Sequence, residues 1–491
     1  MSQTLRDART YEEQRERFIS PLNRPAFHLS ARVGWMNDPN GFCYYQGKYH
    51  MFYQYYPYDS HWGPMHWGHA VSRDLLHWAY LPAVLAPDVS YDHAGCFSGS
   101  AVELPDGQHL LMYTGVSREM ADNGALRDVQ TQALAVGDGV NYRKYQHNPV
   151  LTSDDLPPGG SRVHFRDPKM WREADGSYRM VAVNLAEKGG GQVLLYRSED
   201  GYHWAFVSVL AENRDRIGVM WECPDLFSLD GKDVLLASAQ DMLPKGFEYH
   251  NGNGAFYLIG RVDHASGRFL EESDHAADYG IDFYAPQTVL TPDGRRVMIG
   301  WMQNWDTCNL HTPSTAWFGQ MSLPRELHVK NGILYQTPLR ELDALRRERV
   351  EHRDVTVENG EMTLPGVSGR TVDLEIALEA GDYARFAVWF AKNRDYHTGV
   401  SFRPHESVLK IDRKFSGSRR AIIHQRRAKV RHEHGRLKLR LILDRYSVEV
   451  FINDGEKVMS ATLYTELNAD EIAFFADGKA TFSVTKYTLA D

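Results

Sequence analysis

Two acidic side chains, Asp38 and Glu222, lie in motifs that suit their carboxyl groups to opposite roles. Asp38 lies in Asn-Asp-Pro-Asn-Gly at residues 37–41, where the proline fixes the backbone and nearby donors can hold the carboxylate ionised. Trp221 and Cys223 flank Glu222 and offer it no positive partner, and burial near negative charge would keep it protonated. An ionised carboxylate can attack an electrophilic carbon, and a carboxylic acid can protonate a leaving oxygen. The simpler interpretation of Glu222 is a solvated residue in a surface turn.

A third carboxylate, Asp167, has cations on both sides of it in the sequence. Arg166 precedes it directly, and Lys169 follows nearby. Paired charge keeps an aspartate ionised, which disqualifies Asp167 as an acid and suits it to ordering hydroxyl groups. A salt bridge that stabilises the fold is the alternative, and both can hold.

An internal repeat of about 60 residues organises the first two thirds of the chain. Each copy has a short polar or proline-containing opening, an apolar run, a glycine turn and a second apolar run, which is typical of a β-hairpin. Roughly 60 residues accommodate four short strands and their loops, the content of a propeller blade. The copies therefore predict a five-bladed β-propeller. Their turn glycines are Gly47, Gly107, Gly176, Gly231 and Gly294.

A propeller would bring the openings of these copies together. Its innermost strands surround one axis, so corresponding residues of the five blades converge on one funnel. Three carboxylates that are far apart in the sequence would then share a pocket. The openings carry Asp38, Ser98, Arg166 with Asp167, Glu222 and Tyr284.

The last third of the chain predicts a second domain. Leu339, Leu342 and Leu345 have helical spacing in a segment rich in Arg and Glu, which predicts a helical linker. Short alternating strands follow, as at residues 371–376 and 447–452, and they indicate a β-sandwich. The expected fold class is all-β. We expect a propeller catalytic domain at residues 1–338 with a short charged helix at 12–17, a helical linker at 339–353 and a β-sandwich domain at 354–491.

Charge and composition exclude other classes of protein. A formal net charge of −9 argues against a general nucleic-acid binder. Basic residues predominate between Arg413 and Arg440, but they alternate with apolar residues and indicate solvated strand faces. A contact between copies of the chain in a homo-oligomer is the alternative for this segment.

The sequence predicts a cytoplasmic protein that does not enter membranes. Residues 1–20 contain no apolar signal segment, and no stretch reaches about 18 apolar residues. The cysteines have no paired local spacing, which predicts reduced thiols rather than a disulfide framework. They are Cys43, Cys96, Cys223 and Cys308.

Three histidines, His61, His66 and His69, raise the question of a metal site. Their spacing matches neither the helical pair of zinc hydrolases nor a zinc finger, and the intervening glycines exclude a regular helix. We interpret them as polar packing in a loop around the pocket. We expect no metal and no cofactor.

Five short motifs occur in order along the chain: WMNDPNG at residues 35–41, FSGSA at 97–101, FRDPK at 165–169, WECPD at 221–225 and DFYAPQ at 282–287. Together they closely resemble the signatures of glycoside hydrolase family 32, the invertases and other β-fructofuranosidases. The resemblance extends to residues 447–453 and covers nearly the whole chain. Within the family it looks most like intracellular bacterial enzymes that split sucrose and raffinose or sucrose 6-phosphate. It implies a five-bladed propeller joined to a β-sandwich.

The resemblance implies roles for the three carboxylates. Asp38 would be the nucleophile that attacks the anomeric carbon, and Glu222 would give a proton to the departing sugar and then take one from water. Asp167 would stabilise the oxocarbenium-like transition state through the fructose hydroxyls. A retaining reaction requires the attacking carboxylate and the proton donor to lie roughly 5–5.5 Å apart.

Further residues would line the fructose subsite by the same resemblance. Gln54 and Ser98 would hydrogen-bond hydroxyl groups, while Trp62, Phe97 and Trp301 would supply apolar walls that exclude water. Ordinary core packing is the alternative for each of them, and we expect fewer than all to be contacts. The full set is Asn37, Gln54, Trp62, Phe97, Ser98, Arg166, Tyr284 and Trp301.

The leading hypothesis is a retaining β-fructofuranosidase that hydrolyses sucrose and related β-D-fructofuranosides. A fructosyltransferase that makes short fructo-oligosaccharides would use the same residues, whereas a binding module without activity is disfavoured because all three carboxylates are present. Unphosphorylated sucrose is preferred to sucrose 6-phosphate by a narrow margin, and raffinose and short fructans remain open. A phosphorylated leaving group would want Arg, Lys or His at the pocket rim. Arg118, Lys188 and Lys245 are available in loops, but the sequence does not place them there.

Overall fold

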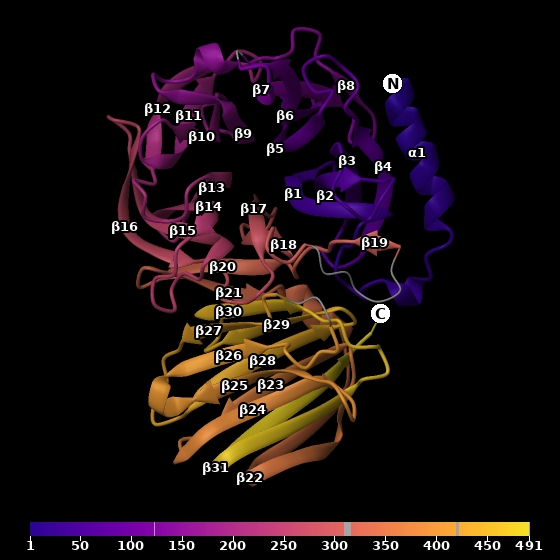
Figure 1. Ribbon diagram of the computed structural model, residues 1–491, viewed down its shortest axis with the longest axis vertical. Coiled ribbons are helices and arrows are strands. Elements are labelled where there is room, and N and C mark those ends of the chain that lie inside the picture. The colour runs from indigo at the N-terminus through magenta and orange to yellow at the C-terminus, as the bar shows by residue number, and fades with distance from the viewer. Residues whose placement is uncertain (122, 309–315, 419–421, 491) are drawn as a thin grey trace.

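The computed structural model of the protein describes residues 1–121, 123–308, 316–418 and 422–490. Figure 1 shows a ring of small sheets packed against one larger folded sheet. Strands dominate both parts, so the predicted all-β fold is confirmed. Within the described residues, no helix combines the length and the apolar character needed to cross a bilayer.

Five sheets surround a central axis, and the predicted five-bladed propeller is confirmed (Figure 1). In each blade the first strand lies nearest the axis and the following strands lie outside it in an antiparallel order. The blades are β1 (Gly34–Tyr45), β2 (Lys48–Tyr56), β3 (His66–Ser72) and β4 (Trp78–Leu85); β5 (Gly95–Glu103), β6 (His109–Met120), β7 (Leu126–Gly137) and β8 (Tyr142–Lys144); β9 (Gly160–Arg172), β10 (Tyr178–Ala186), β11 (Gly190–Ser198) and β12 (Ala205–Glu212); β13 (Trp221–Leu229), β14 (Lys232–Met242), β15 (Gly252–Asp263) and β16 (Arg268–Ala276); and β17 (Tyr284–Leu290), β18 (Arg296–Trp301), β20 (Arg325–Lys330) and β21 (Ile333–Pro338).

A short late strand closes the ring. β19 (Trp317–Phe318) leaves the last blade and pairs in parallel with β1 of the first, with Gly34 opposite Trp317. Because the two ends of the propeller are hydrogen-bonded to each other, the inner strands are held at fixed positions around the axis.

The N-terminal helix is longer than the predicted helix at residues 12–17. α1 (Gln3–Glu16) begins after Ser2, whose side chain accepts a hydrogen bond from the backbone N–H of Leu5 at 3.2 Å, and it lies along the outside of β4 (Figure 1). The helix buries Leu5, Ala8 and Glu12. Its contact face has only two apolar residues, so the apolar periodicity is too weak to show where the helix begins. Only its highly charged C-terminal part was predicted.

The second domain is built from a ten-stranded sheet that folds into two layers, as expected for a β-sandwich. The first half of β31 pairs with β24 and its second half pairs with β23, so this strand belongs to both layers. Side chains such as Val388 and Leu441 meet in one core between the layers. The strands are β22 (Arg346–Ser368), β23 (Val372–Leu378), β24 (Tyr383–Lys392), β25 (Thr398–Arg403), β26 (Val408–Asp412), β27 (Gln425–Lys429), β28 (Leu437–Asp444), β29 (Ser447–Ile452), β30 (Lys457–Thr462) and β31 (Glu471–Leu489).

The expected helical linker at residues 339–353 has a different structure. Only a short 3-10 helix, η3 (Arg340–Leu345), separates the domains, and β22 begins at Arg346. Leu339, Leu342 and Leu345 are all buried. Their spacing therefore reflects a shared buried face and not a regular α-helix. The other 3-10 helices are η1 (Pro21–Asn23), η2 (Ser153–Asp155) and η4 (Pro404–Glu406).

Buried ion pairs join the two domains, and one of them corrects the interpretation of the basic segment. Arg413 is fully buried, and its Nη1 lies 2.5 Å from Oδ2 of Asp282 in the propeller. Arg325 of the propeller similarly contacts Glu449 of the sandwich at 2.6 Å. Arg413 is therefore an interface residue and not part of a solvated strand face.

Candidate active site

Each innermost strand carries a β-bulge at the place where the sequence predicted a functional residue. The pairing register shifts between Met36 and Pro39 in β1, and equivalent shifts occur in β5, β9, β13 and β17. Three residues at these bulges have left-handed backbones, with φ of 61° at Asp167, 50° at Cys223 and 50° at Ala285. A bulge re-aims side chains and often stores backbone strain at functional sites. Here the bulges redirect polar side chains near the beginning of each inner strand.

Side chains from four blades meet in a single cluster. Ser98 Oγ donates a hydrogen bond to Oδ2 of Asp38 at 2.9 Å. Cys223 Sγ lies 3.5 Å from the same oxygen and 3.7 Å from Oδ2 of Asp167, and the Cys223 backbone N–H donates to that Asp167 oxygen at 3.0 Å. The structure thus brings Asp38, Asp167 and the strand of Glu222 together around one sulfur atom.

Glu222 has the cationic partner that the sequence interpretation denied it. Arg166 donates to Glu222 Oε1 through Nε at 3.2 Å and through Nη2 at 2.9 Å, while its Nε is 3.7 Å from Oδ2 of Asp167. The expectation that Arg166 serves chiefly Asp167 is therefore corrected. Sequence neighbours point in different directions at a bulge, so the guanidinium reaches across to the next blade.

The electrostatics of the other two carboxylates also differ from expectation. Burial, and then the charge of Glu222, raises the pKa of Asp38 to about 6. Burial also raises the pKa of Asp167, because the cost of desolvation outweighs the favourable charge of Arg166. The neighbouring donors, Ser98 and Cys223, only partly offset the burial of Asp38. The pKa values of Asp38 and Asp167 are therefore both shifted towards neutral pH.

Two more predicted residues hold the carboxylates in place. Tyr284 donates its hydroxyl hydrogen to Oε2 of Glu222 at 2.6 Å, so both Glu222 oxygens have partners. Asn37 accepts a hydrogen bond from Trp35 Nε1 at 2.7 Å, and its side chain opposes the rise in the pKa of Asp38. Within the described residues, the buried Oδ1 of Asp38 has no hydrogen-bond partner.

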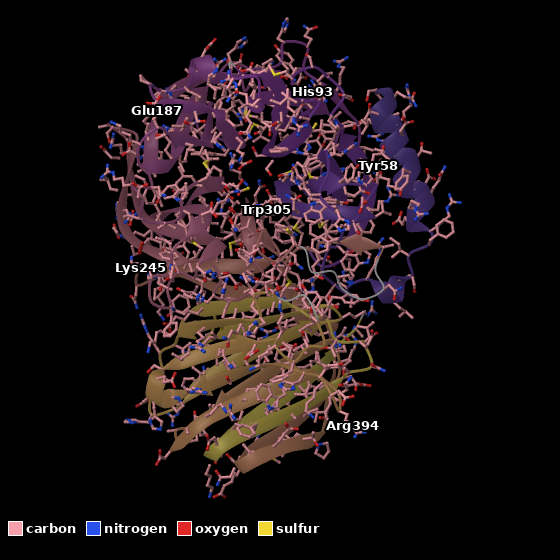
Figure 2. All side chains as sticks on the ribbon, in the orientation of Figure 1. Tyr58, His93, Glu187, Lys245, Trp305 and Arg394 are labelled. Carbon is pink, nitrogen blue, oxygen red and sulfur yellow. The ribbon has the colours of Figure 1, made fainter. Side chains whose placement is uncertain are left out.

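The remaining predicted contacts divide between the rim and the core. Trp62 is 45% exposed, and its ring lies 6.2 Å from that of Phe97 at the mouth of the site. Gln54 is buried and donates to the Cys96 carbonyl at 3.1 Å. Trp301 is fully buried and packs 5.2 Å from the ring of Trp305, which Figure 2 labels near the centre of the ring of blades.

Sequence reasoning missed several residues that support the cluster. Thr114 accepts the Asp167 backbone N–H at 3.0 Å, and His164 Nδ1 lies 3.1 Å from Nη1 of Arg166. Cys223 lies next to Glu222 in the sequence, yet only its left-handed backbone turns its thiol towards Asp38. The order of residues in these motifs was visible in the sequence, but the direction of each side chain was not.

The three histidines do not form a loop around the pocket. His66 and His69 lie on β3, where His66 Nδ1 contacts the Pro64 carbonyl and His69 Nε2 lies 3.0 Å from His50 Nδ1. His61 is exposed beside Asp59. Among the described residues, no group of three His, Cys, Asp or Glu could hold a metal ion.

The cations proposed for a phosphorylated leaving group are engaged or point elsewhere. Arg118 Nε pairs with Asp128 Oδ1 at 3.1 Å on the β6–β7 hairpin. Lys188 is exposed. Lys245 lies at the outer edge of the ring in Figure 2, where its Nζ is 3.9 Å from Asp274 Oδ2.

Comparison with known families gives a match to almost all of the chain. Residues 28–338 match the glycosyl hydrolases family 32 N-terminal domain, and residues 341–490 match the glycosyl hydrolases family 32 C-terminal domain. The match includes every residue of the carboxylate cluster.

Individual relatives agree with this match. The chain is 39% identical to a sucrose-6-phosphate hydrolase of Escherichia coli, over 92% of this chain and 91% of that protein, and 38% identical to a raffinose invertase of Escherichia coli, over 92% of each. A solved structure of a mutant GH32 β-fructofuranosidase of Bombyx mori in complex with sucrose is similar, with 35% identity, a TM-score of 0.84 and coverage of 100% of this chain and 99% of that one. A sucrose-6-phosphate hydrolase from Lactobacillus gasseri superposes with 28% identity and a TM-score of 0.83, over 99% of this chain and 96% of that one.

Proposed function

The chain belongs to glycoside hydrolase family 32, and from that premise we propose that it is a retaining β-fructofuranosidase acting on sucrose and related β-D-fructofuranosides. One observation carries the proposal. Asp38, which has a free and buried carboxylate oxygen, lies in the same cluster as Glu222, whose carboxyl group Arg166 and Tyr284 fix in place. An attacking carboxylate and a positioned proton donor are the two groups that a retaining glycosidase needs.

In the first step, a carboxylate oxygen of Asp38 forms a bond to the anomeric carbon of the fructosyl group. The bond from that carbon to the leaving-group oxygen breaks, and Glu222 gives this oxygen its proton. A covalent fructosyl ester on Asp38 results. In the second step, Glu222 takes a proton from water, the water oxygen attacks the anomeric carbon, and the ester bond to Asp38 breaks.

The other residues of the cluster keep these two groups in position. Ser98 donates a hydrogen bond to Oδ2 of Asp38 and so helps to fix the orientation of the carboxylate. Asp167 is buried beside the reacting centre, where it can accept hydrogen bonds from fructose hydroxyls and stabilise positive charge in the transition state. Trp62 and Phe97 supply an apolar wall at the mouth.

We propose unphosphorylated sucrose as the principal substrate. Two features support this choice: Arg118 already has a carboxylate partner, and Lys245 lies at the outside of the propeller. Relatives that are named for sucrose 6-phosphate and for raffinose make both sugars the proper competitors in a test. Transfer of fructose to a second sugar remains the alternative outcome of the second step.

We also propose a cytoplasmic location. The four cysteines are free thiols, two of them buried, which suits a reducing compartment.

The deciding experiment compares kcat/KM for sucrose, sucrose 6-phosphate, raffinose and kestose on the wild type. We expect sucrose to give the highest value, and a higher value for sucrose 6-phosphate would replace it as the substrate. NMR of the first-formed fructose should show retention, and inversion would exclude the ester on Asp38. A trisaccharide that dominates the products at high sucrose would identify a transferase. Asp38→Ala is the control, because any turnover that it retains belongs to a contaminant.

A further inference from the structure

A second cavity of about 950 Å³ opens at the other end of the propeller axis. All five innermost strands line it, and Figure 1 shows these strands nearest the centre of the ring. Their contributions begin a few residues beyond each bulge: Phe42 on β1, Ala101 on β5, Lys169 on β9, Asp225 on β13 and Thr288 on β17. The catalytic cluster occupies the beginning of the same strands, so the two sites lie towards opposite ends of the inner strands.

Buried hydrogen bonds between blades separate the two ends. Gln287 donates from Nε2 to the Gly99 carbonyl at 2.9 Å and accepts the Phe42 backbone N–H at 3.2 Å, so it connects three blades. Ser100 Oγ donates to the Pro168 carbonyl at 2.8 Å. Gln287 and Ser100 are both buried. A ligand in the second cavity would therefore not occupy the fructose subsite.

Three of the four carboxylates that line the cavity already have partners. Asp225 accepts the Thr288 backbone N–H at 2.7 Å and lies 3.3 Å from Lys169 Nζ. Asp233 accepts hydrogen bonds from Ser228 and from the Val262 backbone. The remaining two are Glu173, which pairs with Arg179 at 3.1 Å, and Glu103, which is exposed to solvent.

Arg296 is a lining cation with an unsatisfied buried donor. Its Nε is buried and, among the described residues, has no hydrogen-bond partner, while Nη1 reaches Thr288 Oγ1 only at 3.4 Å. Its guanidinium stands 4.9 Å from the centre of the Phe227 ring. Burial lowers the pKa of Arg296, and the more distant charge of Asp225 only partly opposes this. A buried guanidinium without a full set of acceptors is costly, and an anion would supply them.

The rest of the cavity fits a hydroxylated body attached to that anion. Phe227 and Trp171 line the wall with aromatic rings, and Glu103, which is exposed to solvent, can accept hydrogen bonds from hydroxyl groups. A free phosphate ion would leave most of the volume unfilled. We propose that this distal cavity is a second binding site, which takes a small phosphorylated sugar with its phosphate on Arg296.

Calorimetric titration tests this proposal with glucose 6-phosphate, glucose and inorganic phosphate as probes. The titrations use the full chain carrying Asp38→Asn and an excess of sucrose, so that the catalytic pocket is filled and the sugar is not consumed. We expect one site for glucose 6-phosphate that sucrose does not compete for. Arg296→Met in the same background should weaken its binding by about tenfold or more, as expected for the loss of a charge-assisted bond. Arg179→Met is the matched control and should leave the affinity unchanged, because Arg179 already pairs with Glu173.

Several results would overturn the proposal. Absence of binding, competition by sucrose, or equal affinity in Arg296→Met would each do so. Inorganic phosphate that binds as tightly as glucose 6-phosphate would exclude a sugar body, and glucose that binds equally well would exclude the role of the anion. Arg296→Lys keeps the positive charge and serves as a control for a folding defect. It should bind glucose 6-phosphate more tightly than Arg296→Met does. Equal weakening in the two folded variants would contradict recognition by charge. Failure of sucrose hydrolysis would affect the proposed function but not this site.

Discussion

Arg166 donates two hydrogen bonds to a single oxygen of Glu222, from Nε at 3.2 Å and from Nη2 at 2.9 Å. The other Glu222 oxygen accepts the Tyr284 hydroxyl, so the carboxyl group cannot rotate without losing a strong bond. A proton donor must point at the leaving oxygen, and these contacts provide that orientation. Arg166 is therefore a positioning residue for Glu222 as well as a neighbour of Asp167.

Arg166→Lys should lower kcat/KM for sucrose by about 10–100-fold, because an ammonium group cannot reproduce the two-pronged contact. In the Glu222→Gln background the same substitution should cost much less, since the group that it positions is already disabled. Steady-state kinetics of the four proteins give the coupling. Arg179→Lys is the matched control at an Arg–Glu pair outside the site, and it should change kcat/KM little. Full additivity of the two losses would contradict the positioning role.

The sequence was sufficient to predict the propeller and the gathering of its inner strands, because the repeat and the hairpin pattern depend on apolar periodicity. It was not sufficient to predict the partners of each carboxylate. At a bulge one residue adopts a left-handed backbone, as at Asp167 and Cys223, and alternate side chains no longer point to alternate faces. For this reason the sequence pairs Arg166 with its neighbour Asp167. In the structure the guanidinium is 3.7 Å from Asp167 but only 2.9 Å from Glu222 in the next blade.

The sequence also could not predict which side chains are buried by residues that are far away in the chain. Arg413 belongs to a segment that alternates like a solvated strand, yet Asp282 of the propeller, which the alternation cannot reveal, covers it. The leucines at 339, 342 and 345 have the spacing of a helical linker, but they are buried in a segment that forms only η3 before β22 begins. Periodicity indicates which residues share a face of an element, but it does not show what packs against that face.

Tyr284→Phe should lower kcat by about 10-fold and leave the fold intact, because it removes the bond to Glu222 Oε2 and keeps the aromatic ring. Tyr279→Phe is a close control: its hydroxyl makes a bond of the same length, 2.6 Å, to Glu248 outside the site. Both variants should lose similar thermal stability, but only Tyr284→Phe should lose activity. Equal kcat values for the two variants would show that Tyr284 does not act through Glu222.

The pH dependence of activity should report the buried nucleophile. Burial raises the pKa of Asp38 to about 6, and only the ionised carboxylate can attack. We expect kcat/KM for sucrose to fall about tenfold for each pH unit below this value. A profile that stays flat down to pH 4.5 would contradict the raised pKa of Asp38.

The same pKa has a consequence for stability. Because the folded-state pKa of Asp38 lies above its ordinary value of 3.8, the folded state binds this proton more tightly than the unfolded chain does. The ionised carboxylate therefore destabilises the fold increasingly between pH 4 and pH 6, and fully above pH 7. Asp38→Asn should raise the free energy of unfolding by about 1–3 kcal/mol at pH 7.5 and by much less at pH 4. Denaturant titrations at both pH values measure this, and an equal change at both would contradict the assignment.

The ion pair between the domains should carry a large share of their attachment. Arg413 and Asp282 are both fully buried, and the same Asp282 oxygen also accepts the Thr462 backbone N–H at 2.8 Å. Removing one member of a buried pair leaves the other uncompensated, so Arg413→Met should destabilise the protein by about 3–5 kcal/mol. Arg403→Met is the control, because its partner Glu406 is 3.1 Å away at the exposed surface and such a pair contributes at most about 1 kcal/mol. Thermal unfolding measures both variants. In the double variant Arg413→Met/Asp282→Asn most of the lost stability should return, because no buried charge is then unpaired. A further loss of stability in the double variant would show that the pair does not act through its charges.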